Sequence, residues 1–159
     1  MSIFLKIPGI NGNVSSGGHK NWIAIDNVDF SIKRFIHTEP GKVNDRDNHI
    51  PNLSEFEMTK KLDNASHHLF AAACSGKVYD QIELHVCATD KALEPYAKYK
   101  LFDAMISMVH TAMHNNAIPM EMISINYTKI ESTYISRDAK GVKQAPFTVG
   151  YDQASAEIL

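Results

Sequence analysis

The chain has 159 residues, of which 44% are hydrophobic and 21% are charged. This balance is typical of a globular protein with a packed core, and it excludes a disordered or fibrous chain. The length predicts one domain spanning residues 1–159. The formal net charge of −2 provides no basic surface for nucleic acid or for an anionic membrane, so neither is expected as a partner.

The chain shows no membrane-spanning or targeting segment. No window approaches the roughly 18 consecutive apolar residues that a membrane-spanning helix needs. Residues 1–9 lack the basic start and the apolar stretch of a cleaved signal peptide. We therefore expect synthesis in the cytoplasm and, if the protein is exported, export by a machine that does not read such a signal. The two cysteines, Cys74 and Cys87, do not make a disulfide framework, and their apolar contexts predict small buried residues.

The N-terminal third predicts strands separated by two loops. A short strand over residues 2–7 precedes a loop rich in Gly, Ser and Asn over residues 11–20. In a longer strand over residues 22–35, the apolar positions are first odd and then even: Ile23, Ile25, Val28, Phe30 and Ile32. Because side chains alternate between the faces of a strand, the apolar face changes phase at residues 26–27. A β-bulge or a bend there would keep both sets on one core, as in a barrel.

A long polar segment follows over residues 37–52. Loops of this length are uncommon in compact domains and are usually functional or mobile. Two interpretations stay open, a flexible insertion and an arm that becomes ordered against a neighbouring subunit. Residues 45–47 have the Asp-x-Asp start of a calcium loop, but Ile50 and Phe56 replace its required Gly and Glu. A solvated loop is therefore expected there.

One helix is predicted over residues 66–75, after a strand over residues 53–61. Ser66 is expected to be its N-cap, with Phe70 in a hydrophobic staple and Gly76 ending the helix. A stripe spaced i, i+3, i+4 would pack against the sheet; it comprises Leu69, Ala72 and Ala73.

The second half of the chain predicts further strands and contains one conflict. Residues 78–88 alternate as an amphipathic strand, and residues 120–134 form a strand whose apolar phase shifts near residue 128, which implies a second bend. A turn over residues 138–141 precedes a last strand over residues 142–151. The conflict lies in residues 96–113, where helical spacing and the helix preference of Ala and Met compete with partial alternation. The pattern alone slightly favours a helix, although sheet context can override propensity.

No residue pattern supports a catalytic, metal or cofactor site. His85 and Cys87 share a strand face, but the paired ligands of a zinc site are missing. Cys74 stands at a helix C-terminus, where the partial negative charge disfavours a reactive thiolate. Neither a G-x-S-x-G elbow nor a phosphate-binding glycine motif occurs.

Two carboxylates and the sole tryptophan are further candidate site residues. Glu121 and Glu131 are ten positions apart, roughly 33 Å along a straight strand, and too far to act as an acid–base pair. Each is expected to bind a basic or hydroxyl group on an adjacent strand. Trp22 is expected to be a core anchor.

Several short motifs occur in a fixed order along the chain: His19-Lys20-Asn21-Trp22, Lys61-Leu62-Asp63, Ala71-Ala72-Ala73-Cys74-Ser75-Gly76, and Pro119-x-Glu121 followed by Glu131-x-x-Tyr134. Together they resemble the hemolysin-coregulated protein (Hcp) family, the tube subunits of bacterial type VI secretion systems. The chain departs from the family pattern at Asn21, where a glycine is usual, and in its histidine-rich helix start. The first departure is mild, because asparagine tolerates positive φ better than most residues.

The resemblance implies a mainly β fold: a small two-sheet β-barrel with one flanking short α-helix and a long extended loop. It places a strand over residues 96–113. It also implies that six copies close into a ring, that rings stack into a secreted tube, and that the lumen carries effectors. The partners would be further copies, a spike protein and sheath proteins, with no enzyme activity and no cofactor. The loop would contact a neighbouring subunit or ring through Val43, Asn44, Asp45, Arg46, Asp47 and Asn48.

Two alternatives remain beside this expectation. A tube protein of a related contractile tail or injection apparatus, such as a phage tail tube, would share these features. The second alternative is a small β-barrel enzyme or ligand binder.

Overall fold

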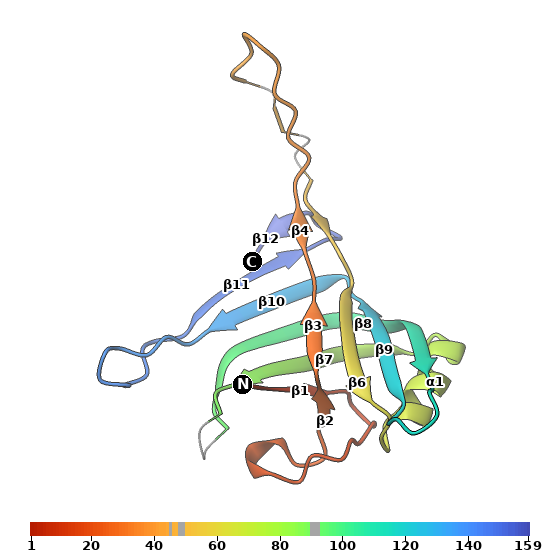
Figure 1. The fold of residues 1–159 in the computed structure, drawn as a ribbon. Coiled ribbons are helices and arrows are strands. Elements are labelled where there is room, and N and C mark those ends of the chain that lie inside the picture. The colour runs from red at the N-terminus through yellow and green to blue at the C-terminus, as the bar shows by residue number, and fades with distance from the viewer. Residues whose placement is uncertain (45, 48–49, 90–92) are drawn as a thin grey trace.

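A computed structural model describes residues 1–44, 46–47, 50–89 and 93–159. Figure 1 shows a curved sheet wrapped into a barrel, with helix α1 (Ser66–Ser75) at one end and a long arm at the other. A smaller projection leaves the sheet between strands β10 (Lys129–Tyr134) and β11 (Phe147–Asp152). The predicted fold class, mainly β with one short flanking helix and a long extended loop, is confirmed.

The barrel is a closed circuit of antiparallel pairs. Its strands are β1 (Ser2–Lys6), β2 (Ile23–Ile25), β3 (Asn27–Asp29), β6 (Phe56–Lys61), β7 (Val78–Cys87), β8 (Pro95–Ala112) and β9 (Met120–Asn126). The pairs run β2–β1–β7–β8–β9–β6–β3. Only Asp26 separates β2 from β3, and its N–H donates to the Thr59 carbonyl at 2.8 Å. The circuit therefore closes around one core.

The bend at Asp26 confirms the predicted phase change. Before it, β2 pairs with β1, and after it, β3 pairs with β6 on the other wall. Ile23 and Ile25 are buried, and Val28 and Phe30 pack against the same core. The predicted single strand over residues 22–35 is thus divided between walls, and its last part, β4 (Ile32–Lys33), leaves the barrel.

Residues 96–113 form a strand, as the family resemblance implied. β8 bends at Asp103, whose φ is 48°. On the side away from β7, β8 pairs with β10 up to Phe102 and with β9 from Met105 onward. The chain between β9 and β10 turns at the same level, where Thr128 donates its N–H to the Phe102 carbonyl and its hydroxyl to Asp103 Oδ2. The second predicted bend is therefore confirmed, and it matches the bend in β8.

Beyond the barrel, the sheet continues through β10 and β11 to the short strand β12 (Glu157–Ile158). The arm begins with β4 and returns through β5 (Asn52–Leu53), which pair with each other. The last predicted strand, over residues 142–151, is corrected, since β11 begins only at Phe147 after a turn in which two backbone N–H groups donate to Asp138 Oδ1.

Helix α1 has the predicted bounds, but its start differs from the prediction. The N-cap is Ala65, and Phe70 is 63% exposed, so neither the Ser66 cap nor the staple forms. Ser66 is instead the first helical residue, and its hydroxyl joins a buried network. At the other end, Gly76 adopts the predicted left-handed conformation with φ 64° and donates to the Ala72 carbonyl.

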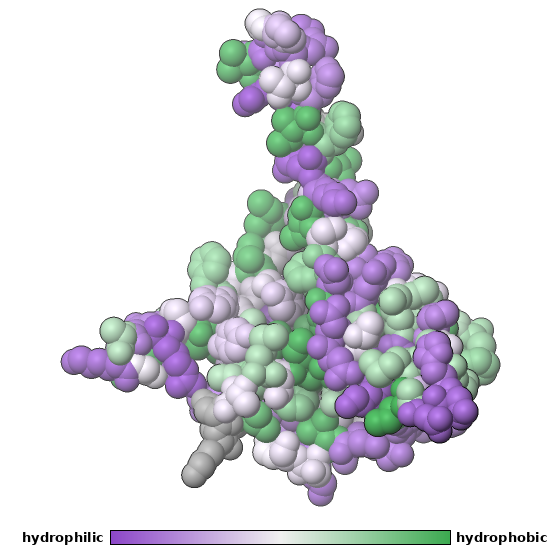
Figure 2. Space-filling model, viewed as in Figure 1, coloured by the Kyte–Doolittle hydropathy of each residue, from purple (hydrophilic) through white to green (hydrophobic). Residues whose placement is uncertain are grey.

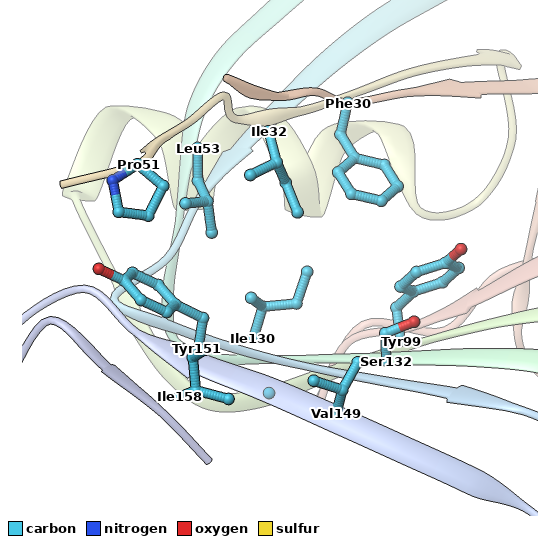
Figure 3. A pocket seen from close by; sticks show the side chains of 11 residues that line it. Phe30, Ile32, Pro51, Leu53, Tyr99, Ile130, Ser132, Val149, Tyr151 and Ile158 are labelled. Carbon is cyan, nitrogen blue, oxygen red and sulfur yellow. The ribbon is translucent and has the colours of Figure 1, made fainter. Parts of the chain in front are cut away.

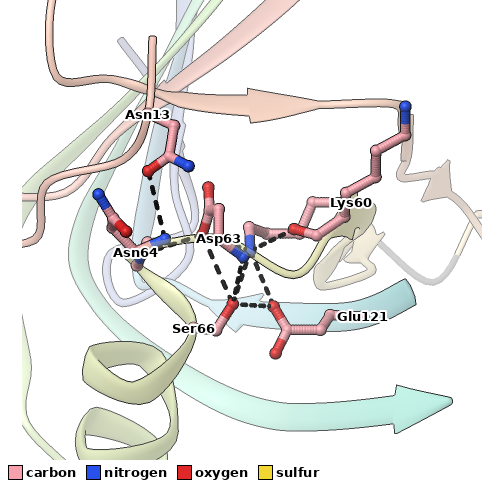
Figure 4. A network of polar contacts seen from close by, with 8 residues as sticks. Asn13, Lys60, Asp63, Asn64, Ser66 and Glu121 are labelled. Carbon is pink, nitrogen blue, oxygen red and sulfur yellow. Dashed lines mark hydrogen bonds and ion pairs between the residues drawn. The ribbon is translucent and has the colours of Figure 1, made fainter. Parts of the chain in front are cut away.

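That network fixes the helix start to two barrel strands (Figure 4). Lys60 Nζ, which is 0% exposed, lies 2.8 Å from both Glu121 Oε2 and Asp63 Oδ1. The Ser66 hydroxyl donates to Glu121 Oε2 at 2.7 Å. The prediction that Glu121 binds a basic or hydroxyl group on an adjacent strand is confirmed, because Lys60 lies opposite it in the β6–β9 pair.

The barrel interior is filled by aliphatic side chains and an aromatic group. Phe56 is stacked on Phe30 with ring centroids 4.3 Å apart, and Tyr99 and Tyr127 meet Phe56 edge-on. Leu69 and Ala72 bring the helix stripe into this core.

The two cysteines differ from each other. Cys87 is buried as predicted, whereas the prediction for Cys74 was wrong, because Cys74 is exposed on α1. Cys87 belongs with Trp22 and Phe4 to a second, smaller cluster, which confirms Trp22 as a core anchor.

Candidate assembly surface

The arm comprises residues 32–53 and projects from the barrel as an extended, self-paired hairpin (Figure 1). It is longer on its first side than the predicted loop over residues 37–52. Beyond the β4–β5 pair, Ile36 bridges Asp47, and the His37 N–H donates to the Arg46 carbonyl at 2.8 Å. The two sides of the arm therefore support each other well beyond its base.

An ion pair reinforces the arm part-way along its length. Arg34 Nε donates to both carboxylate oxygens of Asp47, at 2.6 and 2.7 Å. The hydrogen bonds that Arg34 donates to this carboxylate raise the pKa of its guanidinium. Near the tip, Lys42 pairs with Glu39 at 2.8 Å. The arm thus has hydrogen bonds and ion pairs of its own.

The described ones among the predicted contact residues, namely Val43, Asn44, Arg46 and Asp47, lie in the outer part of this arm. Val43 is 79% exposed, Asn44 and Arg46 are also exposed, and Asp47 holds Arg34. Asp45 and Asn48 lie outside the described residues. The role of the six residues in subunit contact stays a prediction.

The arm also carries large apolar side chains that the prediction did not single out. Figure 2 shows hydrophobic patches recurring along the arm and at its base among polar residues. The exposed ones are Ile32, Phe35, Ile36, Val43 and Ile50. Phe35, at 70% exposed, was expected to end a barrel strand. Contiguous exposed apolar side chains of this kind mark interaction surfaces.

An apolar groove of about 300 Å³ lies where the arm leaves the barrel. Figure 3 shows arm side chains facing those of the sheet across the gap. Ile32, Pro51 and Leu53 form one wall, and the opposite wall comes from β8, β10, β11 and β12 with Tyr99, Ile130, Val149, Tyr151 and Ile158. Sequence reasoning missed this groove, because its two walls come from segments that are distant in the chain, the arm on one side and strands β8 to β12 on the other.

The edge of β11 that faces away from β10 is only partly covered by another strand. Only Tyr151 and Asp152 pair with β12, whereas all six β11 residues pair with β10. Phe147 and Val149 are exposed beside this edge. The projection leading into it is tied back by Glu94, which lies 2.8 Å from both Arg137 and Lys143. These two cations lower the pKa of Glu94.

The described residues contain no group of three or more His, Cys, Asp and Glu side chains placed to hold a metal ion. Glu131, the second candidate carboxylate of the sequence analysis, lies opposite Lys100 in the β8–β10 pair. Within the described chain, no helix is both long and apolar enough to cross a membrane.

The chain matches known proteins in sequence and in fold. The family described as "Type VI secretion system effector, Hcp" matches residues 4–134. A solved type six secretion system protein aligns with a TM-score of 0.91 at 20% identity, over 99% of both chains. Hcp1 from Salmonella typhimurium aligns with a TM-score of 0.81 at 22% identity, over 99% of this chain and 98% of that one. No curated protein matches the sequence significantly.

Hcp2 from Salmonella typhimurium also aligns, with a TM-score of 0.74 at 25% identity, over 99% of both chains. Strands β11 and β12 follow the matched region of the family, but these structures extend over them too. The family match covers well over half of the 159 residues. The chain therefore belongs to the Hcp family of type VI secretion system effectors.

Proposed function

We propose that copies of this chain close into hexameric rings, and that the rings stack into the inner tube of a type VI secretion system. The tube is exported without a cleaved signal peptide and carries effectors in its lumen, with the spike and sheath proteins as further partners. The role is mechanical rather than catalytic. The observation that carries the proposal is the arm, whose apolar side chains stay exposed in the single chain.

The arm suits contact between unlike surfaces of identical copies. It is held by its own backbone pairs and by the Arg34–Asp47 ion pair, so it reaches a neighbour already ordered. Pre-ordering lowers the entropy cost of association. An arm that meets a different surface on the next copy makes a heterologous contact, which closes rings or builds filaments. The exposed β11 edge offers a second way for copies to join, by strand pairing.

A charge placed on the arm tests this proposal. We expect the native chain to form annular particles in negative-stain micrographs and a hexameric mass in light scattering. Ile36→Asp combined with Val43→Asp should give a folded monomer with an unchanged circular dichroism spectrum, since both side chains are exposed. Val142→Asp is a matched control, because Val142 is an exposed valine on the other projection and should leave the rings intact.

Two outcomes would count against the proposal. A native chain that stays monomeric at high concentration would remove the tube role, and rings formed by the double variant would remove the arm from ring closure. The related reading, a phage-like tail tube, predicts the same rings. The location of the protein distinguishes the two functions. A secretion tube appears in the culture medium and needs the sheath ATPase to reach it, whereas a phage tube appears in virions.

A further inference from the structure

A small buried cluster lies on the outer face of β1 and β7, where residues 11–22 cross the sheet. Phe4, Trp22 and Cys87 form its apolar part. His19, from the short 3₁₀ turn Gly17–His19, is 4% exposed and lies between Phe4 and Trp22, with ring centroids 4.6 and 4.7 Å away. The titratable side chain of His19 is therefore part of the buried cluster that packs residues 11–22 against the sheet.

His19 forms a direct bond to a second histidine. Its Nε2 lies 2.9 Å from Nδ1 of His85 on β7, and the Cys87 sulfur lies 3.8 Å from the same His19 nitrogen. Such a bond needs one ring to present an N–H and the other a lone pair. If both rings were protonated, two N–H groups and two positive charges would face each other at this distance. The bond therefore exists only while at least one ring is neutral.

The surroundings favour the neutral rings. Burial lowers the pKa of His85 to about 4, with further contributions from Lys98, His19, Lys6 and Lys100. Burial and Lys98 also lower the pKa of His19. One carboxylate, Glu83 of β7, faces the pair, 3.8 Å from the other ring nitrogen of His85. The cations come from both strands that flank β7, namely β1 and β8.

The rest of the loop is bonded mostly to itself. Gly12 donates to the Asn21 carbonyl, and Asn21 donates back to the Val14 carbonyl. Asn13 makes a side-chain contact with the residues before α1, accepting the Asn64 N–H at 3.3 Å. The histidine pair and its aromatic neighbours are therefore the main tie between the loop and the sheet.

We propose that the His19–His85 pair is an acid-sensitive latch, which holds residues 11–21 on the barrel at neutral pH and releases them when both rings become protonated. The direction follows from linkage. In the released state both rings are solvated and titrate near about 6.5, so that state binds more protons than the latched one. The latch is at full strength above this value and weakens as the pH falls toward 4.

Trp22 is the only tryptophan in the chain, and it touches both histidines, so its fluorescence reports on the latch. We would record its emission, the far-UV circular dichroism, and hydrogen-exchange protection factors for residues 11–21 from pH 7.5 to pH 4. Protection should fall on the order of 100-fold or more across this range, because uptake of even one proton on release changes the equilibrium about tenfold for each pH unit below about 6.5. The emission should change in parallel, while the circular dichroism stays constant.

Non-titrating replacements identify the pair. His19→Gln with His85→Asn places amides near the two bonded ring nitrogens, and this variant should keep the loop protected without pH dependence between pH 7.5 and 4. His67→Gln, at an exposed helix position, should behave like the native chain. If the double variant does not fold, the histidine titrations of the native chain by NMR decide, and two rings must titrate at the pH where the loop opens.

The latch is refuted if protection of residues 11–21 is the same at pH 7.5 and pH 4. It is also refuted if the loop opens only as the circular dichroism collapses, or if the double variant retains the native pH dependence. None of these results depends on whether rings form, so failure of the latch and failure of the proposed tube role are distinguishable.

Discussion

At the scale of single residues, the most consequential one is a lysine in the core. Lys60 lies on a barrel strand at a position where its fully buried ammonium meets two carboxylates and a hydroxyl. A buried charge is tolerated only when it is paired and hydrogen-bonded. The network explains why the chain places Asp63, Ser66 and Glu121 around this point, and it joins two strands to the helix start.

Removing the ammonium should therefore be costly. We expect Lys60→Met to lower the free energy of unfolding by about 3–5 kcal/mol, because Glu121 and Asp63 are left close together without a cation. Urea unfolding followed by circular dichroism measures this. Lys61→Met, at the neighbouring exposed position, should change the same free energy by less than about 0.5 kcal/mol. Equal effects of the two changes would show that the network contributes nothing specific.

Gly12 gives a second prediction at this scale. A methyl group there would lie 2.4 Å from the Trp22 carbonyl oxygen and 2.7 Å from Ile23 Cα. Neither is a movable side-chain end, so the backbone must shift, and Gly12→Ala should destabilise the fold by about 1–3 kcal/mol. Gly18→Ala is the control, since a methyl group at Gly18 meets nothing within 4 Å. Thermal melts of both variants check this, and similar melting temperatures would contradict the close approach.

At the scale of elements, bends decide how the strands are used. β8 has buried residues at Leu101, Ala104 and Ile106. The left-handed residue Asp103 places Leu101 and Ala104, three positions apart, on the same core face. Because of this bend, the buried positions do not alternate strictly, and strict alternation is what identifies a strand in a sequence. Pairing with β7 up to Met105 and with β9 from Met105 to Ala112 keeps the segment extended.

The helix contributes to the core through few residues. Leu69 is completely buried, whereas Phe70 next to it is largely exposed. We expect Leu69→Ala to lower the free energy of unfolding by about 2–5 kcal/mol, because it leaves a cavity between helix and sheet. Phe70→Ala should cost about 0.5 kcal/mol or less. Chemical denaturation gives both values, and a larger loss for Phe70 would contradict the orientation of the helix.

At the scale of the whole molecule, the barrel and its projections have separate tasks. The circuit of strands encloses the core, and among the described arm residues only Leu53, at the base of the arm, packs against it. The arm beyond its base holds exposed side chains bonded mainly to each other. Folding and assembly should therefore respond to different substitutions.

Deleting residues 43–48 tests this separation. We expect the shortened chain to keep the melting temperature of the native barrel, because shortening a loop changes its closure entropy only slightly. It should weaken ring closure or stacking, seen as fewer annular particles and shorter tubes in electron micrographs. Unchanged rings and tubes would remove this segment from assembly, and a large drop in melting temperature would show that the arm supports the barrel after all.

Local sequence rules determined much of this protein by themselves. Alternation located most of the strands, and its phase change at residues 26–27 located a bend, because a strand can present only one face to a core. The helix and its glycine stop followed from local spacing and from the positive φ that glycine tolerates. Motif order identified the family, since the matched residues hold their spacing along the chain.

Only the tertiary structure decided the rest. Ser66 looked like a helix cap, but a buried lysine from another strand takes its hydroxyl into a network. The groove, the histidine pair and the partner exchange along β8 all join residues that are distant in sequence. Periodicity reports only which face of a segment is apolar. It does not report which segment lies opposite that face. The groove, the histidine pair and the change of partner along β8 each depend on that opposite segment, which only the folded barrel determines.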